Sequence, residues 1–302
     1  MSFDILGLGT IALDNVLYVD RFPEPDTKTR ASSRRQQLGG ITATALIAAS
    51  RLGCRCAYAG TLGESESTTK ALRILEGEGV NAEHVKFEGE GGPVETTVIV
   101  DQSSQTRTII SDLTGTLGAS EDHPPDELIQ SSKILFVDHY GVEGMTRAAK
   151  IARSSGVSVV ADLERSEWPG FDVLLSLVDH LILSREVSAR ITGCAGVAEM
   201  VSGMWQEDRE IVVVTDGADG CWYRSRESEE VKHRPAFEVD AIDTTGCGDV
   251  FHGAYCWALL QNLPIDERIR FASAAAAVKA TRLGGSPAAP TIEEVSTLLS
   301  QD

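Results

Sequence analysis

The sequence predicts an α/β protein with a doubly wound, mainly parallel sheet, helices on both faces and a small inserted β lid. Short apolar runs alternate with helical patterns between residues 134 and 215, and another apolar run opens the chain. Such alternation is typical of a parallel sheet, because each crossover helix covers one face of it. A chain of 302 residues, 42% of them hydrophobic, can form one such domain with a full core. We therefore expect a single domain over 1–302.

The first elements have clear patterns. Residues 5–8 are apolar and bounded by glycine, which predicts a buried strand. Residues 42–52 are apolar nearly all round and end at Gly53, which predicts a buried helix. A strand over 57–62 and an amphipathic helix over 68–78 should follow.

Two polar segments interrupt this pattern. The β-rich runs 96–100 and 107–111 flank a polar loop and predict a hairpin, and residues 27–37 have too few apolar side chains for a core element. We expect the segments 15–37 and 94–112 to form a small β-sheet lid inserted into the main domain.

The second half returns to alternation. Strands are expected at 134–137, 157–161, 180–183 and 211–215, with helices at 144–154, 171–177 and 187–192 between them. A further strand at 239–242 should lead into a glycine-rich turn, followed by helices at 250–260 and 268–281.

Composition excludes several functions. A net charge of −18 argues against nucleic-acid binding, which needs clustered cations. The six cysteines lack the spacing of a zinc site and are expected as reduced thiols. No apolar stretch approaches membrane-spanning length, and the first residues lack the basic and apolar regions of a secretion signal. We therefore expect a cytoplasmic protein without nucleic-acid or membrane partners.

The most informative segment is 243–249, which reads Asp-Thr-Thr-Gly-Cys-Gly-Asp. Gly246 and Gly248 permit a tight turn and close approach of a ligand, so that peptide N–H groups at the next helix start can converge on an anion. Asp249 lies just inside that helix, where it can accept a proton from a hydroxyl. The alternative is an ordinary strand-to-helix connection with a capping aspartate.

This segment resembles the C-terminal signature of the ribokinase-like (PfkB) carbohydrate kinases, normally Asp-Thr-x-Gly-Ala-Gly-Asp, with Cys247 in the alanine position. The resemblance extends over essentially the whole chain. Local strings at 20–23, 107–109 and 184–187 resemble the ketohexokinase-like branch. The resemblance implies a ribokinase-like fold. It also implies ATP-dependent transfer of the γ-phosphoryl group to a hydroxyl of a small sugar or sugar derivative, with a ketose favoured. Asp249 would be the base, and the amides of Gly246, Cys247 and Gly248 the anion hole.

The resemblance also implies a substrate site. Asp14, Gly39 and Gly40 match positions that hold sugar hydroxyls, and Asp138 matches an acidic sugar contact at a strand end. Thr44 stands where many members have asparagine, and a hydroxyl cannot reproduce the paired donor and acceptor of an amide. His139 and Tyr140 follow Asp138 and are further candidates for substrate selection.

Two lid charges match positions of the ketohexokinase-like branch. Arg107 would approach phosphate, and Asp26 would reach the sugar of a partner subunit, although a solvated lid charge is the alternative for Asp26. Exposed lid edges can pair with one another, so a homodimer is expected.

The resemblance also implies which residues border the nucleotide. Thr215, Gly217 and Gly220 fit a Thr-x-Gly-x-x-Gly loop. Other residues expected near ATP are Thr245, Ser184 and Gly284.

The cofactors implied are ATP and Mg²⁺, with a monovalent cation as an option. Many members carry Asn-x-x-Glu near the metal, whereas this chain has Ser184 and Val187 at those positions. Glu186 is a substitute that can orient magnesium waters, or it is a solvated glutamate at a helix start. The metal ligands are left unassigned.

The same residues are also compatible with other functions. One scaffold serves several alcohols, so a nucleoside kinase and a kinase for an acidic or sulfonated sugar are alternatives. A non-catalytic protein that senses nucleotide or sugar is the alternative from another class. The sequence has no Gly-x-Ser-x-Gly, so a nucleophile elbow is not expected.

Overall fold

A computed structural model describes residues 2–89, 92–104, 106–113 and 117–301. Its main sheet has eight strands in the order β14-β13-β12-β11-β10-β9-β1-β4, and only β13 and β14 run antiparallel to their neighbours. The strands are β1 (Ile5–Leu8), β4 (Cys56–Tyr58), β9 (Ile134–Val137), β10 (Ser158–Ala161), β11 (His180–Ser184), β12 (Ile211–Thr215), β13 (Cys221–Ser225) and β14 (Ser228–Arg234). The expected mainly parallel sheet is confirmed.

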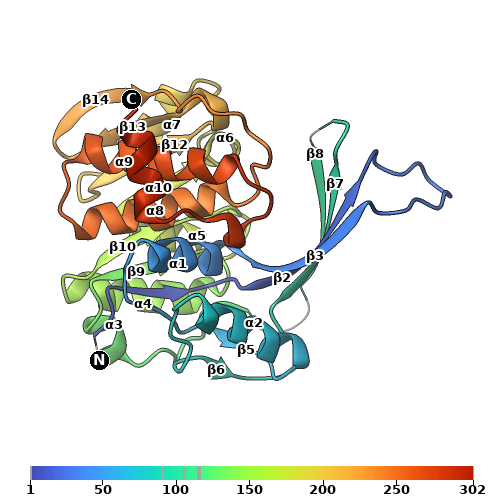
Figure 1. Ribbon diagram of the computed structural model, residues 1–302. Helices are drawn as coiled ribbons and strands as arrows, with labels where there is room; N and C mark the ends of the chain where they lie inside the picture. The colour runs from blue at the N-terminus through green and yellow to red at the C-terminus, as the bar shows by residue number, and fades with distance from the viewer. Residues whose placement is uncertain (1, 90–91, 105, 114–116, 302) are drawn as a thin grey trace.

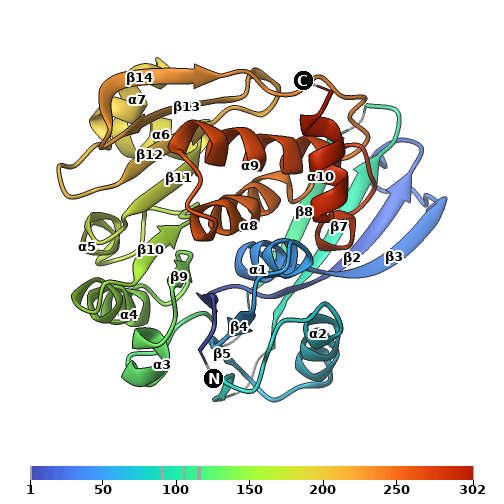
Figure 2. The same cartoon turned by 60° about the vertical axis from the view of Figure 1, so that its left-hand side comes forward.

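Helices cover both faces of this sheet (Figure 2). One apolar core contains residues of α1 (Ile41–Arg51), α2 (Glu66–Gly77), α8 (Cys247–Leu260), α9 (Ile265–Ala280) and α10 (Ile292–Leu299). The opposite core contains residues of α3 (Asp126–Gln130), α4 (Val142–Ser154), α5 (Phe171–Ser176), α6 (Arg185–Thr192) and α7 (Val197–Gly203). Within the described part of the chain, no helix is both long and apolar enough to cross a membrane.

Helices α1 and α8 pack unusually closely. A Cβ on Gly253 of α8 would lie 2.3 Å from the carbonyl oxygen of Ala45 on α1. Glycine is therefore required at this crossing, and the contact fixes the two helices against each other.

A second sheet projects from the main body (Figure 1). Its order is β3-β2-β7-β8, with bounds β2 (Ala12–Val19), β3 (Ser33–Gly39), β7 (Val94–Asp101) and β8 (Thr106–Asp112). These strands fall mostly within the segments 15–37 and 94–112. One face buries a small cluster of Val16, Tyr18 and Val98, whereas every residue of β8 is exposed.

Two sequence predictions differ from the structure. The run 57–62 is divided between β4 and a separate short pair, β5 (Thr61–Leu62) with β6 (Lys86–Phe87). The predicted strand at 239–242 is wrong. Residues 239–242 pair with no strand among those that the structure describes. The segment is bound to the last residue of α9 instead, because the amides of Ile242 and Asp243 donate to the carbonyl oxygen of Ala280 at 2.8 and 3.1 Å.

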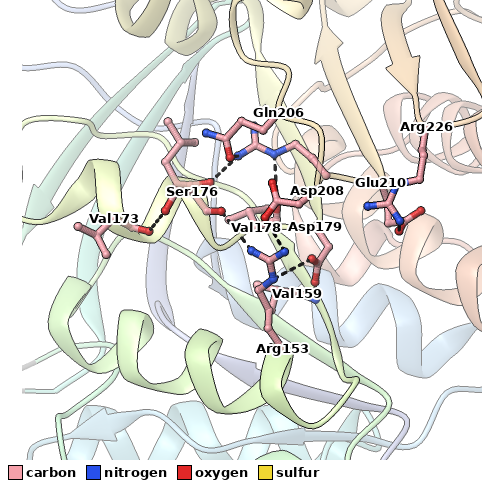
Figure 3. Close-up of polar contacts among 12 residues, drawn as sticks. Arg153, Val159, Val173, Ser176, Val178, Asp179, Gln206, Asp208, Glu210 and Arg226 are labelled. Carbon is pink, nitrogen blue, oxygen red and sulfur yellow. Dashed lines mark hydrogen bonds and ion pairs between the residues drawn. The ribbon is translucent and has the colours of Figure 1, made fainter.

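Polar contacts tie the central strands together at the amino-terminal edge of the sheet (Figure 3). Asp179, just before β11, accepts a hydrogen bond from the amide of Val159 at 2.8 Å and pairs with Nε of Arg153 at 3.3 Å. Arg153 also pairs with Asp208 at 2.8 Å. The opposite, carboxyl-terminal edge carries the candidate site, as expected for an open α/β sheet.

Candidate active site

The glycine turn forms the start of α8. Gly246 is the N-cap and has φ of 75°, in the left-handed region that glycine tolerates. A Cβ on Gly248 would meet no atom within 4 Å, so space is open beside this residue. The amide of Cys247 donates to the carbonyl oxygen of Thr244 at 3.3 Å, so it is already partnered here. First-turn amides have no acceptor within the helix and favour an anion.

The side chain of Asp243 holds the glycine turn in place through hydrogen bonds. Its carboxylate accepts hydrogen bonds from the amides of Thr245 and Gly284, both at 2.8 Å. Burial opposes ionisation of Asp243, but these bonds hold its pKa below the usual value. The fully buried ammonium of Lys279 donates to the carbonyl oxygen of Asp243 at 2.6 Å. The turn is thus fixed to the end of α9 and the loop after it.

The Asp249 carboxyl group lies beside the turn. A Cβ built on Gly246 would be 3.6 Å from its Oδ2 atom. Burial raises the pKa of Asp249 well above its usual value, and the charges of Asp162, Glu164, Asp14 and Asp138 raise it further. A carboxylate that is costly to ionise accepts a proton readily, which suits a general base.

The first helix and the second sheet contribute the predicted sugar-side residues. Asp14 lies within β2 and accepts a hydrogen bond from the Thr96 hydroxyl at 2.6 Å. A Cβ on Gly39 would lie 2.2 Å from Asp14 Oδ2, so only glycine fits there. Gly40, the N-cap of α1, has φ of 89°.

Thr44 connects this group to the glycine turn. It is buried in α1, and its Cγ2 atom would lie 3.4 Å from a Cβ on Gly246. The structure therefore brings Asp14, Gly39, Gly40 and Thr44 to the side of the glycine turn and Asp249.

Asp138, which directly follows β9, is placed differently from Asp14. It is fully buried, with Oδ2 accepting from the amide and hydroxyl of Thr10 at 2.6 and 2.7 Å and from Thr42 at 3.2 Å. Its Oδ1 accepts from the amide of Tyr140 at 2.9 Å. Burial raises the pKa of Asp138 to about 6, against these hydrogen bonds. Both oxygens are engaged within the fold, which favours a structural role.

His139 and Tyr140 also face the interior or the far side of the sheet. Nδ1 of His139 accepts from the amide of Glu164 at 3.2 Å, and burial lowers the pKa of the ring to about 4. Tyr140 lines a hollow of about 400 Å³ together with Trp168 and the first residues of α4. Helix α4 belongs to the face of the sheet opposite α8, so this hollow is separate from the glycine turn.

One lid residue reaches the turn. Nη1 of Arg107 donates to the Thr244 hydroxyl at 3.2 Å. Asp26 lies in the exposed loop between β2 and β3, with a left-handed φ of 62°. No contact links it to the rest of the described site.

The predicted nucleotide residues lie at the ends of β11 and β12. Gly217 and Gly220 have φ of 54° and 87°, and a Cβ on Gly220 would lie 2.1 Å from the carbonyl oxygen of Arg234. Thr215 ends β12, and Ser184 caps α6 by accepting from the amide of Val187 at 3.4 Å.

The donor set for a metal is sparse. Among the described residues, no group of three or more histidine, cysteine or acidic side chains is arranged to hold a metal ion. The Glu186 side chain is 89% exposed and pairs with Arg190 at 3.6 Å. This fits Mg²⁺ that enters on nucleotide phosphates and keeps its waters, because Mg²⁺ rarely needs a cage made only of protein.

Four residues near the turn were missed in the sequence: Asp162, Glu164, His252 and Lys279. Asp162 directly follows β10 and Glu164 lies three residues after its end, so the strand-end position that indicated Asp138 also applied to them. Lys279 lies in an alanine-rich helix, and nothing local indicated that its amine would support the turn.

Comparisons with known proteins identify the family of the chain. The model of the pfkB family carbohydrate kinases matches residues 3–292. The chain is 30% identical to the ribokinase of Haemophilus influenzae, with 97% of each chain covered.

Solved structures are similar over the same length. A putative ribokinase from Agrobacterium tumefaciens has a TM-score of 0.90 and 25% identity, covering 100% of this chain and 98% of that one. The ribokinase of Arabidopsis thaliana, solved with ribose and ATP, has a TM-score of 0.84 and 22% identity, with 99% of both chains covered. Its resemblance shows the shared fold. The chain therefore belongs to the PfkB family of carbohydrate kinases, which are phosphotransferases with an alcohol group as acceptor.

Proposed function

We propose that this carbohydrate kinase uses ATP to phosphorylate a hydroxyl of a small sugar, with a ketose favoured by the local motifs. The observation that carries the proposal is the position of the Asp249 carboxyl group beside the open glycine turn at the start of α8. The ribose and ATP bound in the Arabidopsis thaliana ribokinase support a sugar and ATP as the substrate pair, although ribose is not a ketose.

Asp249 takes the proton of the attacking hydroxyl in this mechanism. Amides of the 246–248 turn stabilise the oxygens of the transferring phosphoryl group, since a helix start favours negative charge. Arg107 adds a positive charge from the lid, and Asp14 orients the sugar. Glu186 would be the residue of this chain able to orient the waters of a Mg²⁺ ion carried by the nucleotide phosphates, and such an ion would neutralise their charge. A monovalent cation remains an option that the sequence resemblance implies.

The pH dependence should report Asp249. Because its pKa is raised, the base is protonated, and inactive, at a higher pH than an ordinary aspartate with a pKa of about 3.9. We expect kcat/KM to fall as pH falls through this raised pKa. A profile of kcat/KM from pH 4.5 to 9 measures it, and full activity at pH 4.5 would contradict the assignment.

The sheet of β2, β3, β7 and β8 is proposed to act as a lid that excludes water.

Arg107→Gln should lower kcat/KM about tenfold or more, because a charged hydrogen-bond donor to phosphate is lost. The matched control is Arg34→Gln. Arg34 lies on β3, bonds to Asn15 at 3.3 Å, and points away from the face that carries Arg107. Equal losses in both variants would remove Arg107 from the mechanism.

The proposed homodimer pairs through the lid. β8 is an exposed edge strand on which Ile109 and Ile110 are 51% and 59% exposed, and such an edge favours pairing with another chain. Sedimentation equilibrium should show a dimer. A monomer at high micromolar concentration would count against this arrangement and against a role for Asp26 in a partner's site.

An ADP-release assay over a panel of acceptors tests the proposal as a whole. Fructose, ribose, a nucleoside and an acidic sugar should be compared at fixed MgATP. Release that depends on a neutral sugar supports the proposal, whereas a nucleoside or an acidic sugar as best acceptor would select one of the alternatives. Tight ligand binding without release by any acceptor would favour a sensing protein.

A further inference from the structure

His252 lies between two backbone carbonyl groups, about one turn along α8 from the proposed base. It is on α8, three residues after Asp249, and only 3% exposed. Nδ1 lies 2.8 Å from the carbonyl oxygen of Gly248, and Nε2 lies 3.0 Å from that of Ile182. A carbonyl oxygen only accepts hydrogen bonds, so both bonds form only when both ring nitrogens carry a proton. A neutral ring would point one nitrogen lone pair at a carbonyl oxygen.

Acidic groups face the same ring. Oδ2 of Asp162 lies 3.4 Å from Nδ1, and Glu164 is close enough for its charge to act on the ring. Burial raises the pKa of Asp162 and of Glu164. Burial lowers the pKa of His252, while the bonds to Gly248 and Ile182 and the Glu164 charge oppose that change. The ring and the carboxyl groups therefore compete for protons.

The geometry favours the charged ring in this competition. An imidazolium satisfies both carbonyl oxygens and faces an ionised Asp162, whereas a neutral ring leaves one buried carbonyl opposed by a lone pair. From β10, a backbone hydrogen bond with Ala161 also raises the pKa of the ring, and the Phe136 ring of β9 lies edge-on at a centroid distance of 5.8 Å. From β11, the ring is contacted by the Ile182 carbonyl oxygen.

We propose that His252 is a buried imidazolium whose charge keeps Asp249 ionised among the neighbouring carboxylates. It is a positioning residue, because it acts through Asp249 and does not touch the reacting atoms. The effect on catalysis rests on the proposed role of Asp249 as the base, whereas the charge of the ring does not.

His252→Gln removes the charge and keeps a hydrogen-bond donor. A nearby positive charge lowers the pKa of a carboxyl group by about 1–3 units, so its loss should move the acid limb of kcat/KM upward by about one pH unit. The variant should then be about tenfold slower below the limb and close to wild type at high pH. An unmoved limb in a folded variant would overturn the coupling to Asp249.

His180→Gln is the matched control. His180 is also buried and bonded, through Nδ1 to the Tyr255 hydroxyl at 2.9 Å, and burial lowers the pKa of its ring to about 3. It should therefore be neutral, and its replacement should leave the acid limb in place. A shift of the same size in both variants would indicate a general packing effect and contradict the proposal.

Nitrogen NMR of the ¹⁵N-histidine-labelled wild-type protein tests the charge without any assay of activity or any variant. At pH 7, both ring nitrogens of His252 should have the similar shifts of a protonated pair, whereas those of His180 should differ as in a neutral ring. One unprotonated nitrogen on His252 would overturn the proposal. A protonated pair in a protein that phosphorylates no acceptor would instead refute the proposed function and leave the buried charge standing.

Discussion

Asp249→Asn is expected to lower kcat by about 10²–10⁴-fold, the usual contribution of a positioned general base. The amide keeps the size of the side chain but cannot take the proton of the attacking hydroxyl. Binding of ATP and sugar, measured by calorimetry, should change little. A kcat within tenfold of wild type would remove Asp249 from the role of base.

The same variant should be more stable than wild type at neutral pH. The folded-state pKa of Asp249 is raised above its unfolded value, so ionisation disfavours the folded state as pH rises, and a neutral amide avoids that penalty. We therefore expect a higher Tm together with the lower kcat. Asp266→Asn is the control, because Asp266 also lies in the first turn of a helix but pairs with Lys232 away from the site. It should retain activity.

Asp138→Ala is expected to lower the free energy of unfolding by about 2–6 kcal/mol. It leaves the buried amide of Thr10 and the partly buried amide of Tyr140 without their acceptor, and each such group costs about 1–3 kcal/mol. Thermal unfolding measures the loss. In the fraction that folds, the KM for sugar should stay within about threefold of wild type, since both oxygens of Asp138 serve the fold.

Asp14→Ala provides the matched comparison. Asp14 is buried at the site and bonds mainly to side chains, so its removal should raise the KM for sugar at least tenfold with a smaller loss of stability. The reverse pattern, with a large KM effect for Asp138 and none for Asp14, would exchange their roles.

The fold could be predicted largely because local patterns and sheet topology agree. The apolar runs at 5–8, 134–137 and 211–215 are strands at the same positions in the structure. The run 239–242 was mistaken because its alternation also suits an extended segment, and its partner is Ala280, which no local pattern reveals. The edge strand β14 is polar along most of its length and therefore lacks the apolar run by which the other strands could be predicted, whereas its neighbour β13 alternates buried and partly exposed residues.

The part of the site at the start of α8 could be predicted because its functional groups lie in one short segment, and the family resemblance indicated Asp14, Gly39, Gly40 and Thr44 beside it. The string 243–249 contains its turn, its glycines and Asp249 together. By contrast, the hydrogen bonds that engage Asp138 come from Thr10 and Thr42, at sequence separations of 128 and 96. The ring of His252 reaches Ile182 over a separation of 70 residues. A strand-end position predicts the edge of the sheet but not whether the side chain turns outward or inward.

The central claim is that a phosphoryl group passes to a sugar hydroxyl between the 246–248 turn and Asp249. Phosphorus NMR of wild-type protein with MgATP and the best acceptor observes that transfer directly. The account predicts a new phosphomonoester signal that grows in step with ADP and is nearly absent with Asp249→Asn. Release of inorganic phosphate in place of a sugar phosphate, or the same product rate with both proteins, would contradict it.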